Sequence, residues 1–210
     1  EFVYSPELST ILVSEEFRLL RMKFDHTGLN ESVNSIMVTS PSNAEGKSMV
    51  AYNLAIVMAQ SGKKVALVDV NFRDSKDEPD NSVSEHYGLS DLLWGTVELD
   101  DVIQPWDENL QFIDAGVDPP TPVDFFNSKP MEKMFKELQK SSDIVIIEGP
   151  PLTSSSSLEL STKIDGVLVV LRYGYTRRGT AQSQFSKLQQ VGGNVLGVVF
   201  SNTPEQMNFI

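Results

Sequence analysis

One short stretch of the sequence carries residue types that can hold a phosphate group. Residues 40–48 read SPSNAEGKS and lie between an apolar run and a helical pattern. A phosphate-binding loop needs converging backbone N–H groups, a helix N-terminus, a lysine for the terminal phosphates and a hydroxyl for Mg²⁺. Gly46, Lys47 and Ser48 supply the last three residues of such a loop. The pattern therefore predicts a site for a nucleotide and its magnesium ion.

The match to the usual phosphate-loop pattern is incomplete. Pro41 occupies the position of the first glycine, and Ala44 stands where a second glycine would ease a positive φ. A capped loop that contains an incidental lysine would share some of these residues. The order of strand, Gly-Lys-Ser and helix favours the phosphate site over that alternative.

Acidic side chains end two other apolar runs. Asp69 lies at the end of one run, Asn71 follows it, and Glu148 ends a later run. In a doubly wound sheet, ligands bind beyond the C-terminal ends of the strands, where residues 40–48 also lie. These side chains can then surround Mg²⁺ and the γ-phosphate, as direct ligands or through water. A single acid at such a position is often only a turn cap, but two beside a Gly-Lys-Ser loop favour a metal site.

Apolar runs and helical patterns alternate along the chain. The expected strands are residues 35–39, 65–70, 110–114, 144–147, 167–171 and 195–200. The expected helices between them are residues 47–61, 130–140, 157–163 and 176–191. Most strands are apolar at successive positions, as in strands that are covered on both faces. We therefore expect a three-layer α/β fold with a doubly wound, mostly parallel sheet, forming one globular unit over residues 31–210.

Residues 1–30 contain a separate helix candidate, residues 15–24, with Ser14 as its N-cap. Its apolar side chains share one face: Phe17, Leu20 and Phe24. Its charged side chains form a neighbouring ridge at spacings of three: Glu15, Arg18 and Arg21. From spacing alone, this ridge is either a solvated row of ion pairs or a contact surface.

Composition limits the function further. The 210 residues carry a formal net charge of −12, which argues against a surface that binds nucleic acid or anionic lipid as a whole. Residues 69–118 hold 14 acidic and 2 basic side chains and so carry all of this net charge. We expect this acidic face to receive a basic segment of a partner.

Missing residue types exclude several kinds of site. The sequence has no cysteine, so disulfides, thiolate metal sites and a cysteine nucleophile are excluded. No apolar run approaches the roughly 20 residues that span a bilayer, and the start EFVYSPELST lacks the basic and apolar regions of a signal peptide. We therefore expect a cytoplasmic location.

Residues 65–73, VALVDVNFR, resemble the second Walker motif of the bacterial tyrosine kinases, or BY-kinases. These are P-loop proteins that partner polysaccharide co-polymerases in capsule and exopolysaccharide export. Further stretches are similar to that family in the same order: Glu-x-x-Arg-x-x-Arg at 15–21, the loop and helix from 45, GLSDLLWG at 88–95, residues 113–126, IIEGPPL at 146–152 and LRYGYTR at 171–177. The resemblance covers nearly the whole chain and implies a P-loop NTPase type of fold.

The resemblance also implies roles for single residues. Asp69 would accept the proton of the attacking tyrosine, and Lys47 would contact the β and γ phosphates. The metal would be held by Ser48, Asn71 and Glu148. Nucleotide contacts would come from Asn43, Ala44, Glu45, Gly46, Lys47, Ser48, Met49 and, near the adenine, Asn202. Glu15, Arg18 and Arg21 would form the contact between subunits of a homo-oligomeric ring.

The resemblance implies cofactors and partners as well. ATP or ADP with Mg²⁺ would be the cofactors, no nucleic acid would bind, and the chain would act at the inner face of the cell membrane beside a co-polymerase or adaptor domain. A neighbouring subunit's tyrosine-rich tail would be the substrate. This chain has Asn71 and Glu148 where the family has aspartates, and its five tyrosines are dispersed. The alternative is therefore a catalytically weakened module that binds nucleotide and controls assembly.

Overall fold

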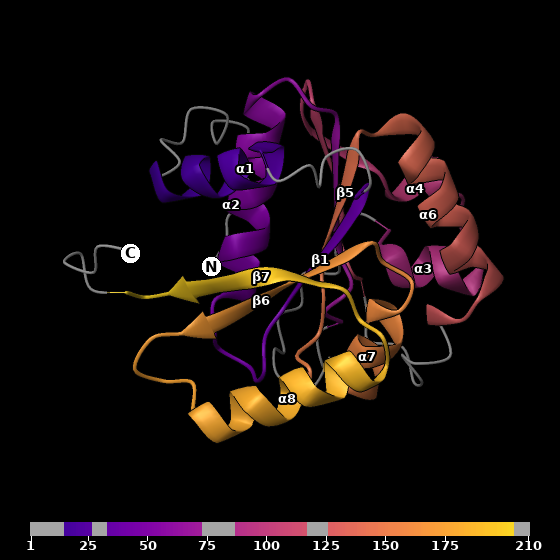
Figure 1. Cartoon of the computed structure of the whole chain (residues 1–210). Coiled ribbons are helices and arrows are strands. Elements are labelled where there is room, and N and C mark those ends of the chain that lie inside the picture. Colours follow the sequence, from indigo (N-terminus) through magenta and orange to yellow (C-terminus); the bar gives the residue numbers. More distant parts are fainter. Residues whose placement is uncertain (1–14, 27–32, 73–86, 117–125, 204–210) are drawn as a thin grey trace, which may run out of the picture.

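The computed structural model describes residues 15–26, 33–72, 87–116 and 126–203. Within these residues the chain forms a seven-stranded sheet with the strand order β3-β4-β2-β5-β1-β6-β7 (Figure 1). The strands are β1 (Ser35–Thr39), β2 (Val65–Asp69), β3 (Gln104–Asp107), β4 (Leu110–Ile113), β5 (Ile144–Glu148), β6 (Gly166–Arg172) and β7 (Val195–Ser201). The helices are α1 (Glu15–His26), α2 (Lys47–Gln60), α3 (Leu89–Trp94), α4 (Leu99–Val102), α6 (Lys129–Ser141), α7 (Ser155–Ser161) and α8 (Arg178–Gln190).

The three central strands are buried along their whole length because helices cover both of their faces. Every residue of β1, β2 and β5 is buried. These strands pair in parallel, and among the described strands only β3, at one edge, runs antiparallel to its neighbour β4. A continuous apolar run is what a strand needs when both of its sides face the core. The expected doubly wound, mostly parallel sheet is confirmed.

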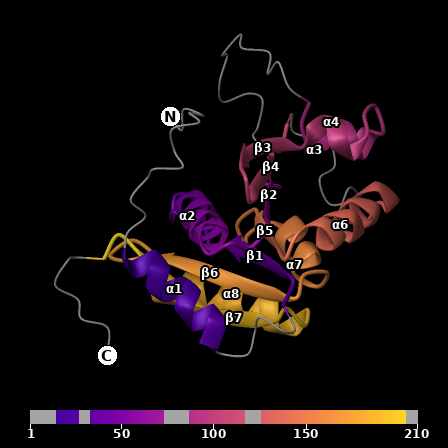
Figure 2. The same ribbon diagram turned by 90° about the horizontal axis from the view of Figure 1, so that it is seen from above.

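Two apolar clusters lie on opposite faces of this sheet. On one face, Leu54 of α2 and Phe24 of α1 pack with the side chains of β1, β2 and β5 that point to that side. On the other face, α3, α6, α7 and α8 contribute Leu89, Met134, Leu160 and Leu188. Helices α1 and α2 lie side by side (Figure 2). The sheet is therefore the middle layer of three.

The expected strands and helices are all present, with ends that differ by a few residues. Three short elements were missed. Helices α3 and α4 have only six and four residues, too few for a helical period to show. Strand β3 contains Pro105 and alternates between half-buried and exposed residues, as an edge strand can. In the described ranges, no helix combines the length and apolar content that a bilayer crossing would require.

Candidate functional site

The parallel sheet brings the candidate binding and catalytic residues to one edge. Strands β2, β5 and β1 are neighbours, and Asp69 at the end of β2 pairs in register with Glu148 at the end of β5. Strand β1 ends at Thr39 and leads through residues 40–46 into α2, which begins at Lys47. Because parallel strands end on the same side, the loop, the two acids and the helix N-terminus meet there.

The loop that precedes α2 contains two residues in the left-handed region. Ala44 has a φ of 60° and Gly46 has a φ of 88°. Glycine adopts this conformation without steric cost, whereas alanine does not. Ala44 thus takes the backbone shape for which a second glycine was expected. Its strained φ must be stabilised by contacts around it.

Lys47 is the buried cation of the site, with 6% of its surface exposed. Burial lowers the pKa of the Lys47 ammonium group, because removing it from water disfavours the charged form. The charges of Glu148, Asp69 and, more weakly, Glu45 act in the opposite direction and favour the cation. A bound phosphate would add further negative charge next to this ammonium group.

Ser48 and Glu148 place two oxygen ligands together. The Ser48 hydroxyl donates a hydrogen bond to Oε1 of Glu148, which is 2% exposed. A hydroxyl and a carboxylate are hard oxygen donors of the kind that Mg²⁺ prefers. Among the described residues, no three His, Cys, Asp or Glu side chains cluster as a metal site. These residues nevertheless fit Mg²⁺, because that ion usually takes few protein ligands and completes its shell with phosphate oxygens and water.

Asp69 lies beside this pair and is 7% exposed. Its Oδ1 accepts a hydrogen bond of 2.8 Å from the backbone N–H of Asn71, which is itself half-buried. This bond orients the carboxylate at the end of β2. The structure thus brings Asp69, Asn71 and Glu148 to one edge of the sheet, as the strand ends predicted.

Glu45 has a structural environment that sequence reasoning missed. It was predicted as a nucleotide contact, and its carboxylate is fully buried among protein donors. Ser42 donates its hydroxyl to Oε1 at 2.6 Å, while Oε2 accepts the backbone N–H of Arg172 at 2.9 Å and the hydroxyl of Thr176. The two partners of Oε2 lie 127 and 131 residues further along the chain, so no local sequence pattern could predict them.

The end of β7 contacts the loop from another side. The Ser201 hydroxyl donates to the backbone carbonyl of Glu45 at 2.6 Å, and a Cβ placed on Gly46 would lie 3.3 Å from Ser201 Oγ. Asn202, the residue expected near an adenine, follows with a φ of 56° and an exposed side chain. Asn43 and Met49 are likewise exposed beside the loop.

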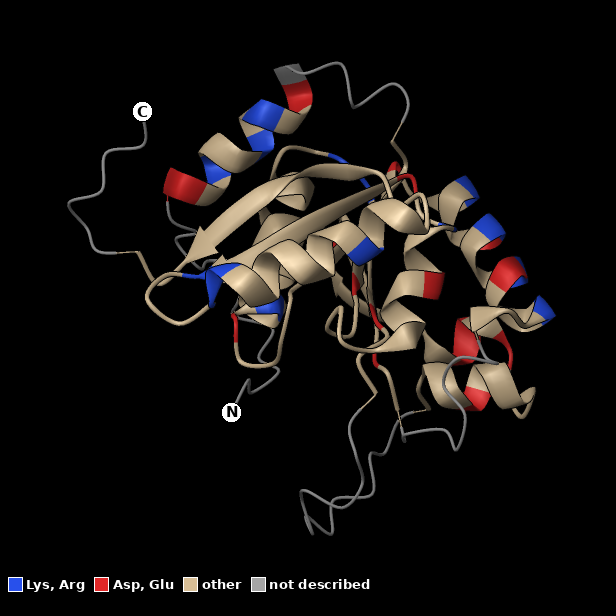
Figure 3. Cartoon of the chain, turned by 60° about the horizontal axis from the view of Figure 1, so that its bottom comes forward, with Lys and Arg blue, Asp and Glu red and all other residues tan. Residues whose placement is uncertain are grey.

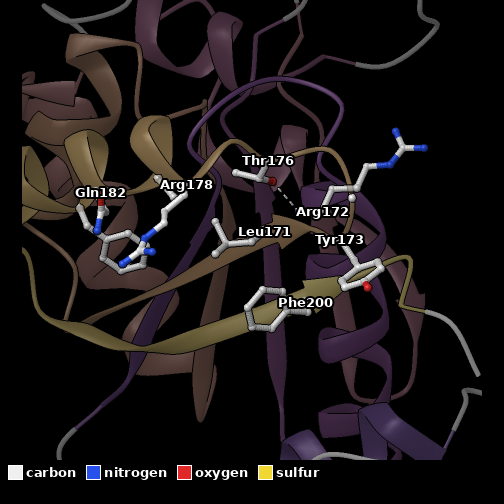
Figure 4. A pocket seen from close by; sticks show the side chains of 10 residues that line it. Leu171, Arg172, Tyr173, Thr176, Arg178, Gln182 and Phe200 are labelled. Atoms are coloured by element: carbon white, nitrogen blue, oxygen red, sulfur yellow. Dashed lines mark hydrogen bonds between the residues drawn. The ribbon is translucent and has the colours of Figure 1, made fainter. Parts of the chain in front are cut away.

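A cavity of about 470 Å³ opens beside this end of the sheet (Figure 4). Leu171, Phe185 and Phe200 form its apolar wall, and Arg178 and Gln182 of α8 reach it from the helix. Two further lining residues, Arg172 and Thr176, also bond the loop. The cavity was not predicted from the sequence, because its walls come from two strands and a helix.

The charged ridge of α1 lies on the surface, away from these buried groups. Arg18 Nη1 and Glu15 Oε2 are 3.4 Å apart, with side chains 49% and 68% exposed. Arg21 lies 4.0 Å from Asp25, and Lys63 of the turn after α2 lies 3.1 Å from the same aspartate. Helix α1 therefore carries both signs of charge on its outer side (Figure 3). The structure thus shows the ion pairs of the ridge, and its role as a contact surface stays a prediction.

Several predictions lie outside the described residues. They concern Ser14 as a cap, the last residue of the motif at 65–73, most of the stretch 113–126 and part of the acidic stretch 69–118.

The sequence matches the CobQ/CobB/MinD/ParA nucleotide binding domain family over residues 36–204. It is 29% identical over 192 residues to tyrosine-protein kinase YwqD of Bacillus subtilis (strain 168), covering 90% of this chain and 81% of YwqD. It is 27% identical over 209 residues to the putative tyrosine-protein kinase CapB of Staphylococcus aureus, covering 99% of this chain and 91% of CapB. The solved kinase domain of Escherichia coli tyrosine kinase ETK superposes with a TM-score of 0.79 at 27% identity, covering 93% of this chain and 79% of that one.

Proposed function

Because the chain belongs to the CobQ/CobB/MinD/ParA nucleotide-binding domain family, we propose that it is an ATP-dependent protein-tyrosine kinase of a capsule or exopolysaccharide export system. The observation that carries this proposal is the meeting of Lys47, Ser48, Asp69 and Glu148 at one edge of the sheet. The names of the relatives, which are tyrosine kinases, support the same activity.

Each of these residues has a distinct task in the proposed reaction. Lys47 and the backbone N–H groups at the start of α2 bind the phosphates, because a helix N-terminus and an ammonium group both favour anions. Ser48, Glu148 and Asn71 would hold Mg²⁺. Bound Mg²⁺ supplies charge neutralisation for the phosphates. Asp69 accepts the phenolic proton as the tyrosine oxygen bonds the γ-phosphorus and ADP leaves.

The weakened assembly module is the less favoured alternative. Asn71 offers an amide oxygen but no charge to a metal, which motivates that alternative. The relatives named as kinases favour an active enzyme. Asn71→Asp separates the two: a weakened site gains Mg²⁺ affinity and turnover from the added carboxylate, whereas an already competent site gains neither.

The proposed setting is a homo-oligomeric ring at the inner face of the membrane, beside a co-polymerase or adaptor domain. The ridge of Glu15, Arg18 and Arg21, which is exposed at Glu15 and Arg18 and half-buried at Arg21, is the proposed subunit contact, because surface ion pairs can exchange partners at little cost. The proposed substrate is a tyrosine-rich tail of a neighbouring subunit. The acidic stretch 69–118 is proposed to meet a basic segment of the membrane partner.

The test is phosphotransfer from Mg-ATP to a tyrosine-bearing peptide supplied in trans, detected as phosphotyrosine by mass spectrometry. We expect the wild type to modify the peptide and Lys47→Met to lose at least about 10²-fold in rate, because one preorganised charge contact to the reacting phosphate is removed. Lys64→Met is the matched control, since Lys64 is an exposed lysine beyond the other end of α2. Absence of phosphotyrosine with the wild type would contradict the proposal.

A further inference from the structure

The carboxylate of Glu45 links the phosphate loop to a segment far away in the sequence. Its Oε2 accepts the backbone N–H of Arg172 at the end of β6 and the hydroxyl of Thr176 in the turn before α8. Its Oε1 accepts the hydroxyl of Ser42 within the loop at 2.6 Å. The side chain has no exposed surface, so a nucleotide cannot displace these donors without rearranging the protein.

Ala44, the residue before Glu45, has a backbone conformation that other contacts must stabilise. Ala44 holds a φ of 60°, which alanine adopts only when its surroundings impose it. Its backbone carbonyl accepts a hydrogen bond of 3.1 Å from Nη1 of Arg172. The following carbonyl, that of Glu45, accepts one of 2.6 Å from Ser201. The contacts from β6 and β7 thus converge on the strained part of the loop.

We propose that Glu45 is a positioning residue, whose carboxylate ties the loop to Arg172 and Thr176 and so keeps it shaped for phosphate before the nucleotide arrives. Figure 4 shows the two partners, with the hydrogen bond from the Arg172 backbone to Thr176. Without the carboxylate, Ala44 would return to a negative φ, and the N–H groups before α2 would point elsewhere. The nucleotide would then have to order the loop itself, which weakens binding.

This inference rests on the proposed nucleotide site, and the experiment keeps the two apart. Mg-ADP affinity is measured by calorimetry for the wild type, Glu45→Ala, Ala44→Gly and the double variant, and the melting temperature of each is measured without nucleotide. We expect Glu45→Ala to weaken Mg-ADP binding about 30-fold through loss of charge-assisted hydrogen bonds. Ala44→Gly alone should lower the affinity less than Glu45→Ala does, because glycine adopts the same positive φ and keeps the backbone N–H of this position.

The double variant carries the decisive result. Glycine tolerates a positive φ without a clamp, so we expect Ala44→Gly to restore at least about fivefold of the affinity lost in Glu45→Ala. If Glu45 contributed only to global stability, Glu45→Ala would lower the melting temperature. Ala44→Gly would then change the Mg-ADP affinity by the same factor in the wild type and in Glu45→Ala. That additive result, or unchanged affinity in Glu45→Ala, would overturn the positioning role.

Two further outcomes are defined. If the wild type binds no Mg-ADP, the proposed function and this inference both fail. If Glu45→Ala does not fold, Thr176→Val replaces it, because this near-isosteric change removes one donor to Oε2. We expect Thr176→Val to weaken Mg-ADP binding about threefold and Ala44→Gly to recover most of that loss. Unchanged affinity in Thr176→Val, or no recovery, would overturn the inference.

Discussion

The candidate site and helix α1 both carry acidic and basic side chains. The two regions differ in how deeply these side chains are buried. Lys47, Asp69 and Glu148 are 6%, 7% and 2% exposed, whereas the side chains of Glu15 and Arg18 are 68% and 49% exposed. A buried charge costs free energy unless hydrogen bonds or opposite charges compensate it. An exposed pair costs little and stabilises little. The first group is therefore built for a ligand, and the second can associate and dissociate without affecting the fold.

The largest expected effect tests the proposed chemical role of a buried acid. Asp69→Asn keeps the side-chain size but removes the proton acceptor, so phosphotransfer should fall about 10²- to 10⁴-fold. Mg-ADP affinity should change much less, because Asp69 is proposed to act on the tyrosine. Single-turnover phosphotransfer and calorimetry measure the two quantities. Equal losses in rate and affinity would make Asp69 a binding residue instead.

The next effect concerns the metal. Glu148→Gln removes the charged oxygen beside Ser48, so the Mg²⁺ concentration needed for half-maximal ADP binding should rise roughly tenfold or more. Titration of Mg²⁺ at fixed ADP measures it. Glu159→Gln on α7 is a control outside the site, since Glu159 is half-buried and is not one of the charges that act on Lys47. An unchanged Mg²⁺ requirement in Glu148→Gln would remove this residue from the metal site.

The lowered pKa of Lys47 predicts a dependence on pH. As the pH rises through that pKa, Lys47 loses its proton, so Mg-ADP affinity should begin to fall below pH 10.5, the ordinary lysine value. The effect on stability has the opposite sign. Between the folded and unfolded pKa values the unfolded chain binds more protons, so the free energy of unfolding should rise with pH in that window.

Both parts of this pH dependence should disappear in Lys47→Met. Calorimetry against pH measures the binding, and urea unfolding against pH measures the stability. Affinity that holds up to pH 10.5 would show that the neighbouring carboxylates outweigh the burial of the ammonium group.

The smallest effect on stability is expected on α1. Arg18→Ala should lower the free energy of unfolding by less than about 1 kcal/mol, because its pair with Glu15 is exposed. Association of the chain, measured by sedimentation velocity, should nevertheless weaken if the ridge is the subunit contact. Lys136→Ala is the control, since Lys136 and Glu132, four residues apart on α6, also form an exposed ion pair on a helix. Equal association of wild type and Arg18→Ala would remove the ridge from the interface.

Sequence patterns predicted the central layer of the fold well. Strands β1, β2 and β5 are continuous apolar runs because both of their faces are covered, and such runs are visible without the structure. Strand β3 and the short helices α3 and α4 were missed, because an edge strand needs no apolar run and a single helical turn shows no period. Their places are decided by the neighbours against which they pack.

The candidate site divides in the same way. Residue type and position at a strand end were enough to select Lys47, Ser48, Asp69 and Glu148, since parallel strands bring their C-terminal ends together. The environment of Glu45 could not be predicted, because the two partners of its Oε2 lie more than 120 residues away and one of them is a backbone N–H. The assignment of Asn202 to the adenine stays a prediction.

By itself, the sequence determined which residues are candidates to bind phosphate and metal and which strands lie in the centre, because side-chain chemistry and apolar periodicity are local properties. Only the tertiary structure decided that Ala44 is held at a positive φ, that Glu45 is buried against β6, and that the charges of α1 stay in water. These features depend on which distant segments pack together, and burial then sets the free energy of each charge.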